Sequence, residues 1–120
     1  MSSTATARYP DSIAATWLAA RFAVEPAKID VMRRNGELIA VREPGSIEWR
    51  YPAWQFESGK PRHGIARVVA TARDAGIDEA GLYDILTASL GLRERGRQRL
   101  VDLLLEGRED EVVAAVKAAR

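Results

Sequence analysis

The chain has 120 residues, of which 47% are hydrophobic and 29% are charged, with a formal net charge of +1 and no cysteine. This composition is typical of a soluble globular protein with one ordinary core or two small modules, and it excludes disulfides and thiolate zinc sites. No apolar run approaches the roughly 20 residues that span a bilayer, and residues 1–8 lack the apolar stretch of a secretory signal, so we expect a cytoplasmic protein.

Residues with catalytic or metal-binding chemistry are scattered rather than grouped. The single histidine, His63, lies beside Gly64 with no second histidine or cysteine nearby, so we interpret it as a polar loop residue and not as a general base or metal ligand. The sequence contains no glycine-rich phosphate loop after a strand and no nucleophile motif. We therefore predict that the protein is not an enzyme and uses no metal and no cofactor.

A first helix is expected to begin just after Asp11 or Ser12, because either side chain can cap a helix. Ile13, Trp17 and Leu18 follow at positions i, i+4 and i+5, so they share one face of that helix. This apolar face is predicted to pack inward.

A second helix is expected from Pro26 to Asn35, because proline suits the first turn of a helix and Gly36 supplies a left-handed residue that stops it. The spacing turns Ile29 and Met32 inward. Two short helices separated by a tight turn form a helix-turn-helix candidate, in which the second helix enters the major groove of DNA. The residues predicted to face outward on this helix are Ala27, Lys28, Asp30, Val31 and Arg34.

Two short runs rich in β-branched and aromatic residues follow, at 38–42 and 47–51. Between them, residues 43–46 read Glu-Pro-Gly-Ser, with proline and glycine placed as a type II turn prefers. Helix, turn, helix and hairpin, in this order, are the elements of a winged helix module. The hairpin is expected to lie along the phosphate backbone of DNA.

Five basic residues of this module are predicted to contact phosphates and base edges: Lys28, Arg33, Arg34, Arg42 and Arg50. Phosphate contacts release counterions, so affinity should fall steeply as salt rises. The aromatic residues Trp49, Trp54 and Phe56 can be interpreted as a base-stacking platform. Core packing is the favoured interpretation, because a module this small needs its aromatic residues inside.

The string 22–24, together with Ile29 and residues 32–42, resembles the helix-turn-helix of excisionase-like and MerR-like DNA-binding domains. Those domains read leucine-glycine-valine, then a helix, then an arginine-glycine-arginine-leucine step into the wing. The resemblance spans about residues 12–56 and implies a winged helix-turn-helix that binds operator DNA. The chain departs from the pattern at Glu25, where a serine cap is usual, and at Asp30 and Val31, where polar or basic groups are usual.

The second half of the chain predicts only helices. Apolar residues at Ile65, Val68, Val69 and Ala72 mark a helix that Gly76 can end. Asp78 can cap a further helix, whose apolar residues are Leu82, Ile85, Leu86 and Leu90.

The run from Leu100 to Leu105 is apolar nearly all round, which one neighbouring helix would not cover. Gly107 then breaks the chain, and the acids at 109–111 favour the start of a last helix. We predict that the apolar excess forms a seam between two chains, although an intramolecular core is an equal alternative for any single leucine. The residues assigned to this dimer and partner seam are Leu100, Leu103, Leu104, Leu105, Val112 and Val116.

Residues 91–100 carry four arginines against Glu94 alone, a local charge of +3. Gly91 and Gly96 favour a loop that displays Arg93, Arg95 and Arg97. Such a loop suits bidentate capture of carboxylates or phosphates. We expect it to contact a protein partner, with DNA or plain solvent as the alternatives.

Residues 100–108, followed by 111–115, are similar to the C-terminal toxin-binding domain of Xre/MbcA/ParS-like antitoxins. There a leucine-rich helix, a glycine turn and a valine-alanine helix close the fold. The similarity covers roughly residues 65–119 and implies a toxin protein as partner. The family has a proline-asparagine-rich stretch before the leucines, where this chain has 91–97.

Together these features predict a mainly α fold with a small β-hairpin wing. A winged helix-turn-helix module is expected over 9–58 and a helical dimerisation or partner-binding domain over 63–119. The expected function is a sequence-specific DNA-binding transcriptional regulator that acts as a homodimer, in the form of an autoregulating antitoxin-like repressor. The alternatives are a phage or plasmid regulatory protein with no toxin, whose helical half only dimerises, and a protein-interaction module with a degenerate helix-turn-helix.

Overall fold

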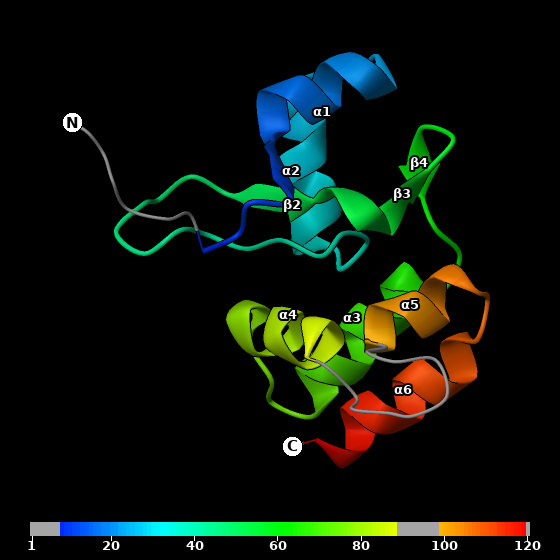
Figure 1. Ribbon diagram of the computed structural model, residues 1–120. Coiled ribbons are helices and arrows are strands. Elements are labelled where there is room, and N and C mark those ends of the chain that lie inside the picture. The colour runs from blue at the N-terminus through cyan, green and yellow to red at the C-terminus, as the bar shows by residue number, and fades with distance from the viewer. Residues whose placement is uncertain (1–7, 89–98, 120) are drawn as a thin grey trace.

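The computed structural model describes residues 8–88 and 99–119. The described chain is mainly helical, with two small antiparallel two-stranded sheets, and measures 40 × 34 × 28 Å along its principal axes. Figure 1 shows α1 and α2 with the sheets in one half of the molecule and α3 to α6 in the other. The coarse prediction of a mainly α fold with a little β structure is therefore confirmed.

The first half contains β1 (Ser12–Ala14), α1 (Ala15–Phe22), α2 (Pro26–Arg34), β2 (Arg50–Pro52), the short 3-10 helix η1 (Ala53–Gln55), β3 (Phe56–Glu57) and β4 (Lys60–Pro61). The second half contains α3 (Ile65–Asp74), α4 (Glu79–Thr87), α5 (Leu100–Leu105) and α6 (Glu109–Ala118). Strand β1 pairs with β2, and β3 pairs with β4.

The first helix begins later than its sequence predicts. Ser12 lies in β1 opposite Pro52 of β2, and α1 starts at Ala15 without a side-chain cap. The capping prediction is wrong because both polar groups have other partners: the Ser12 hydroxyl donates to the Tyr9 carbonyl at 2.6 Å, and Asp11 accepts from Trp54. The predicted apolar face is wrong in part, since Leu18 is buried whereas Trp17 is 53% exposed.

The second helix matches its prediction closely. It runs from Pro26 to Arg34, buries Ile29 completely, and is followed by Gly36 at φ +80°. The turn before it is tight, because the Val24 N–H donates to the Ala19 carbonyl at 3.0 Å. This turn places Ala23 in the left-handed region at φ +58°, which residues with a Cβ adopt only at a cost.

Residues 38–41 form an extended wall between two hydrophobic cores. Leu38 and Ala40 belong to the core under α1 and α2, Ile39 to the core of the helical half, and Val41 to a small cluster with Tyr9 and Tyr83. All four are at most 2% exposed, because alternate side chains of an extended chain point to opposite sides. Because both sides of this segment face a core, residues 38–41 are all apolar.

The predicted hairpin is only partly present. Val41 and Arg50 form one antiparallel bridge with N–O distances of 2.9 and 2.8 Å, and the remainder of 42–49 is a loop. The predicted strand over 38–42 is wrong because the backbone of Ile39 bonds to a side chain and β2 pairs with β1. The turn at 43–46 has the expected geometry, with Gly45 at φ +83° and the Ser46 N–H donating to the Glu43 carbonyl at 2.9 Å.

The side chain that bonds to the backbone of Ile39 belongs to Gln55, a fully buried polar residue that the sequence analysis did not single out. Its amide oxygen accepts from the Ile39 N–H at 2.7 Å, and its amide nitrogen donates to the carbonyls of Ile39, at 2.7 Å, and Pro52, at 3.1 Å. Gln55 thus replaces a neighbouring strand for the backbone of the wall segment.

The predicted helices of the second half are confirmed, including the cap at Asp78, whose carboxylate accepts from the Gly81 N–H at 2.8 Å. Leu90 lies outside the described residues. The expected seam between chains is wrong for five of its six residues, which have exposures of 0–8% inside the chain's own core; Leu105, at 39%, is exposed. Helix α5 is apolar nearly all round because it shares a core with residues of α3, α4 and α6 together. The five buried residues are Leu100, Leu103, Leu104, Val112 and Val116.

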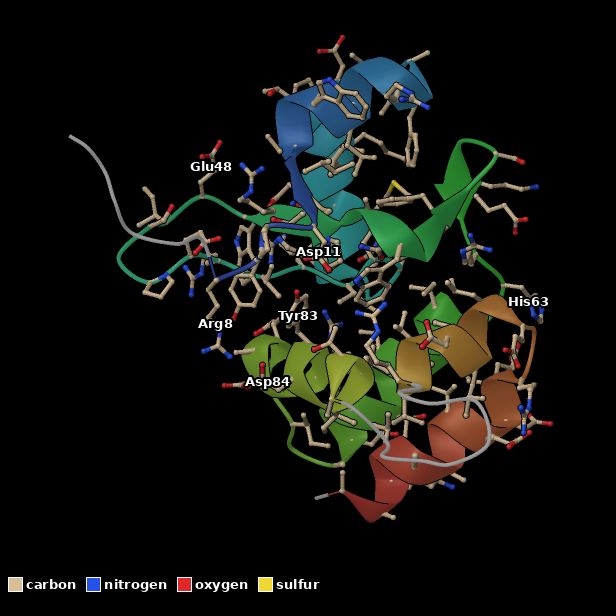
Figure 2. The ribbon with its side chains drawn as sticks, in the orientation of Figure 1. Arg8, Asp11, Glu48, His63, Tyr83 and Asp84 are labelled. Carbon is tan, nitrogen blue, oxygen red and sulfur yellow. The ribbon has the colours of Figure 1, made fainter. Side chains whose placement is uncertain are left out.

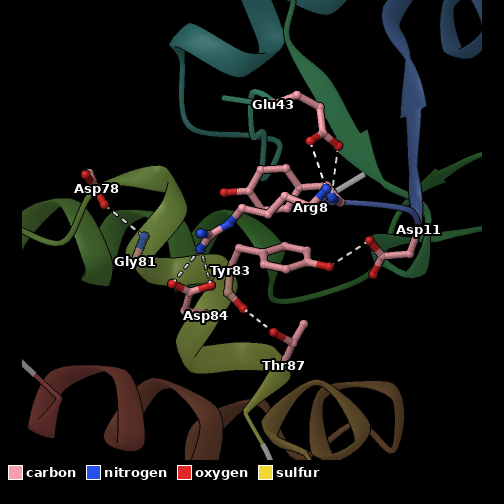
Figure 3. A network of polar contacts seen from close by, with 9 residues as sticks. Arg8, Asp11, Glu43, Asp78, Gly81, Tyr83, Asp84 and Thr87 are labelled. Atoms are coloured by element: carbon pink, nitrogen blue, oxygen red, sulfur yellow. Dashed lines mark hydrogen bonds and ion pairs between the residues drawn. The ribbon is translucent and has the colours of Figure 1, made fainter. Parts of the chain in front are cut away.

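A polar network joins the two halves near the start of the described chain (Figure 3). Arg8 donates to both carboxylate oxygens of Asp84 at 2.8 and 2.9 Å, while Glu43 accepts from the backbone N–H groups of Arg8 and Tyr9. Asp11 accepts from the Tyr83 hydroxyl and the Trp54 indole, both at 2.8 Å. The two-module division over 9–58 and 63–119 stays a prediction, and in this structure the two halves share contacts across the wall segment.

Candidate nucleic-acid interface

Helix α2 presents a basic face to solvent. Lys28 is exposed near its first turn, and the Arg34 side chain is 60% exposed at its end. Val31, at 38% exposure, lies between them along the helix. The predicted outward face of α2 is therefore confirmed as a surface, with a cation toward each end.

The loop that follows β-bridge residue Val41 is tied to α2 through an arginine stack. The guanidinium carbons of Arg33 and Arg42 each lie 4.4 Å from the centroid of the Trp49 ring. Cation–π contacts of this kind favour arginine over lysine, because the planar guanidinium stacks on the ring. Trp49 therefore brings a cation of α2 and a cation of the 42–49 loop to one place.

The aromatic residues divide as the core interpretation predicts. Trp49 and Phe56 are half-buried against the core under α1 and α2, and Trp54 packs against the helical core. Phe56 meets Phe22 edge-on at a centroid distance of 5.5 Å. With Trp49 engaged by two guanidiniums, the preferred interpretation of core packing is confirmed over a base-stacking platform.

Arg33 is mostly buried and contributes to the packing of the fold. Its side chain is only 16% exposed and pairs with Asp30 at 2.5 Å. Its Nε is buried, with no hydrogen-bond partner among residues 8–88 and 99–119. Arg33 is consequently a supporting member of the basic face rather than a freely extended one.

Asp30 is the acid of this face. One carboxylate oxygen accepts from Arg33, and the other accepts from the Arg34 Nε at 3.0 Å. Hydrogen bonding from Arg33 lowers the pKa of Asp30, with the positive charges of both arginines adding to the effect. The carboxylate is therefore ionised at neutral pH and bridges the two arginines.

Arg50 does not extend toward a ligand as the sequence suggested. Its Nε donates to the Ser12 hydroxyl at 3.0 Å and its Nη2 donates to the Ser12 carbonyl at 2.9 Å. This geometry fastens β2 to β1. We accordingly leave Arg50 out of the candidate interface and keep Arg42, which is exposed.

Sequence reasoning missed Arg73, a residue of α3. Its guanidinium donates to the carbonyls of Arg33 and Arg34, at 3.0 and 3.2 Å, and so satisfies the open end of α2. A cation near the C-terminus of a helix also complements its dipole. No local pattern could reveal this contact, because the two partners lie about 40 residues apart in the chain.

Arg93, Arg95 and Arg97, expected to contact a partner, lie outside the described residues. The described chain resumes at Arg99, whose N–H donates to the Asp102 carboxylate at 2.9 Å at the start of α5. This contact orders the entry to the leucine helix.

The edge of the helical half carries a surface cluster of charged side chains. Figure 2 shows His63 at this edge, and His63 pairs there with Glu109 at 2.5 Å. Arg67 donates to Glu109 and Asp110. Within residues 8–88 and 99–119 no group of three or more histidine or acidic residues is placed to hold a metal ion, and no helix there is long and apolar enough to cross a membrane.

Comparison with known proteins gives a fold but no family. No family model matches the chain, and no curated protein matches it. Among solved structures, the chain is similar to the NMR structure of Rv2175c, with a TM-score of 0.79 and 21% identity. The match covers 98% of this chain and 85% of that chain, so the shared fold extends over nearly all of this chain and most of that one.

Proposed function

We propose that the protein is a sequence-specific double-stranded DNA-binding transcriptional regulator. In this proposal α1 and α2 form a helix-turn-helix, α2 enters the major groove, and the 42–49 loop is a wing beside it. The observation that carries the proposal is the exposed basic face of α2, which is joined to the wing because Arg33 of α2 and Arg42 of the loop both stack on Trp49.

DNA recognition needs contacts to phosphates and contacts to base edges, and this face has side chains that can make both. Lys28 and Arg34 lie six residues apart on α2, about 120° around the helix axis with the exposed Val31 midway between them, so their long side chains flank one exposed face and can reach phosphates or base edges there. Arg42 extends the cationic surface to the wing. The net charge of +1 is modest, so binding depends on where these cations lie rather than on the overall charge.

Of the two regulator forms, we propose the one without a toxin. The leucines and valines that resemble a toxin-binding domain are buried in the chain's own core. They therefore stabilise the fold here, and packing inside the chain is enough to explain why the sequence resembles that of antitoxins at these positions. We retain dimer formation in the proposal, because one helix-turn-helix reads only a few base pairs.

The test is a pair of double variants in a mobility-shift assay. The duplexes are the protein's own promoter and sequences selected from a random library. Lys28→Ala/Arg34→Ala is expected to weaken binding on the order of 10- to 100-fold and to reduce the log–log salt slope by about 1 if Arg34 contacts a base edge, or by about 2 if both cations contact phosphates.

The matched control is Arg108→Ala/Lys117→Ala, which removes the same charge from the N-cap residue and the last turn of α6. It is expected to bind like the unchanged protein. Equal affinity of the two double variants would contradict the proposed interface. Light scattering of the protein on a selected duplex measures the dimer, and one chain per duplex at full affinity would contradict that part.

A further inference from the structure

Asp30 occupies an unfavourable position on a surface proposed to face phosphates. Its side chain is 45% exposed, on the same helix as Lys28, Arg33 and Arg34. A carboxylate there repels the DNA backbone and lowers the charge of these four residues from +3 to +2. The pair with Arg33 is half-buried and belongs to the fold, but the pair with Arg34 is exposed and contributes little to folding stability, so stability does not account for the second contact.

The contacts of Asp30 suggest what it does. Its two oxygens engage two different arginines, Arg33 at 2.5 Å and the Arg34 Nε at 3.0 Å. A guanidinium has further N–H donors at its terminal nitrogens. Arg34 can therefore keep its bond to Asp30 through Nε and still present donors in a fixed plane, which is the geometry that reading a guanine edge requires.

We propose that Asp30 is a specificity-determining residue of the DNA interface, which favours a matching base edge over non-cognate phosphates. This inference rests on the proposed function. On a cognate site Arg34 bonds a base while Asp30 holds its plane. On a non-cognate site Arg34 has to leave Asp30 to reach a phosphate, and the carboxylate then lies beside the backbone with Arg33 as its remaining partner. Asp30 thus weakens non-cognate binding more than cognate binding.

The test compares Asp30→Asn with the unchanged protein on a library-selected duplex and on a random-sequence duplex. Affinity for the random duplex should rise on the order of 3- to 10-fold, with a salt slope steeper by about 1, because one more cation is released to pair with phosphate. Affinity for the selected duplex should rise less, so that the ratio of the two affinities falls at least about 3-fold.

Two further variants make the result specific. Asp74→Asn removes one negative charge from the exposed end of α3 and should leave the ratio unchanged. Asp30→Glu keeps the charge on α2 and should retain weak binding to the random duplex. Thermal unfolding of each variant verifies that it is folded.

The possible outcomes separate this inference from the proposed function. If the unchanged protein selects a sequence but Asp30→Asn preserves the affinity ratio, or lowers both affinities equally, the role of Asp30 is overturned and the proposed function stands. If the unchanged protein shows no salt-dependent binding to any duplex, both proposals are overturned.

Discussion

The two halves of this molecule are stabilised by different means. In the helical half, α3 to α6 share a continuous apolar core in which Val68, Leu86 and Val112 are completely buried. In the first half the core is smaller, and buried or half-buried polar groups complete it, notably Gln55, Ser12 and Arg33. The first half therefore depends on satisfied polar contacts and has cations at its surface, whereas the second half buries its apolar residues in its own core.

The largest effect should come from the leucines of α5, where two neighbours differ in environment. Leu104 is 3% exposed and Leu105 is 39% exposed. Leu104→Ala is expected to lower the free energy of unfolding by about 3 kcal/mol, because it removes buried methyl groups and leaves a cavity. Leu105→Ala should cost less than about 1 kcal/mol. Urea unfolding measures both, and equal losses would mean that α5 is not in the core as described.

Gln55 tests the polar side of the comparison. Gln55→Leu keeps the size of the side chain but leaves the N–H and carbonyl of Ile39 without their buried partners. The expected loss is about 2 kcal/mol, since an unsatisfied buried group costs more than a hydrogen bond gains. Urea unfolding is again the measurement. A neutral or stabilising effect would show that apolar packing suffices in the first half too.

Tyr83 tests the junction between the halves. Burial and the bond to Asp11 raise the pKa of Tyr83 above its ordinary value of 10.0. The folded chain therefore holds this proton more tightly, so its contribution to stability is full below about pH 10 and is lost as pH rises above that value. Tyr83→Phe should cost about 1 kcal/mol at neutral pH.

The pH dependence gives that prediction its control. Between about pH 8 and about pH 11 the unchanged protein should lose more stability in urea unfolding than Tyr83→Phe does, because the variant has no hydroxyl to ionise at this site. Parallel losses in the two proteins would contradict the assigned role of the Tyr83 hydroxyl.

The smallest effect is expected at Ala23, and it is stabilising. Ala23 has φ +58°, which costs about 1–2 kcal/mol for a residue with a Cβ. Ala23→Gly removes that cost but adds about 0.5–1 kcal/mol of chain entropy to the unfolded state. A net gain of about 0.5 kcal/mol should appear as a higher melting temperature. A lower melting temperature would mean that the strain at this turn is already relieved.

Local patterns in the sequence were sufficient for much of the helical framework. Pro26 and Gly36 bound α2, Asp78 caps α4, and the turn at 43–46 has its glycine at positive φ, as predicted. These features depend on neighbouring residues in the chain. For the same reason the exposed basic face of α2 could be predicted from spacing alone, since a helix fixes which residues lie on one side.

Only the tertiary structure decided which partners are contacted by residues that lie far apart in the sequence. The pairing of β1 with β2, which the Arg50 side chain fastens at Ser12, turned an expected cap into a strand, and Arg73 reached α2 from a different helix. The apolar excess of α5 suggested a seam between chains because the sequence does not tell how many neighbours surround a helix. The number of neighbours depends on the packing of distant segments, and packing assigned Leu104 to the core and left Leu105 at the surface.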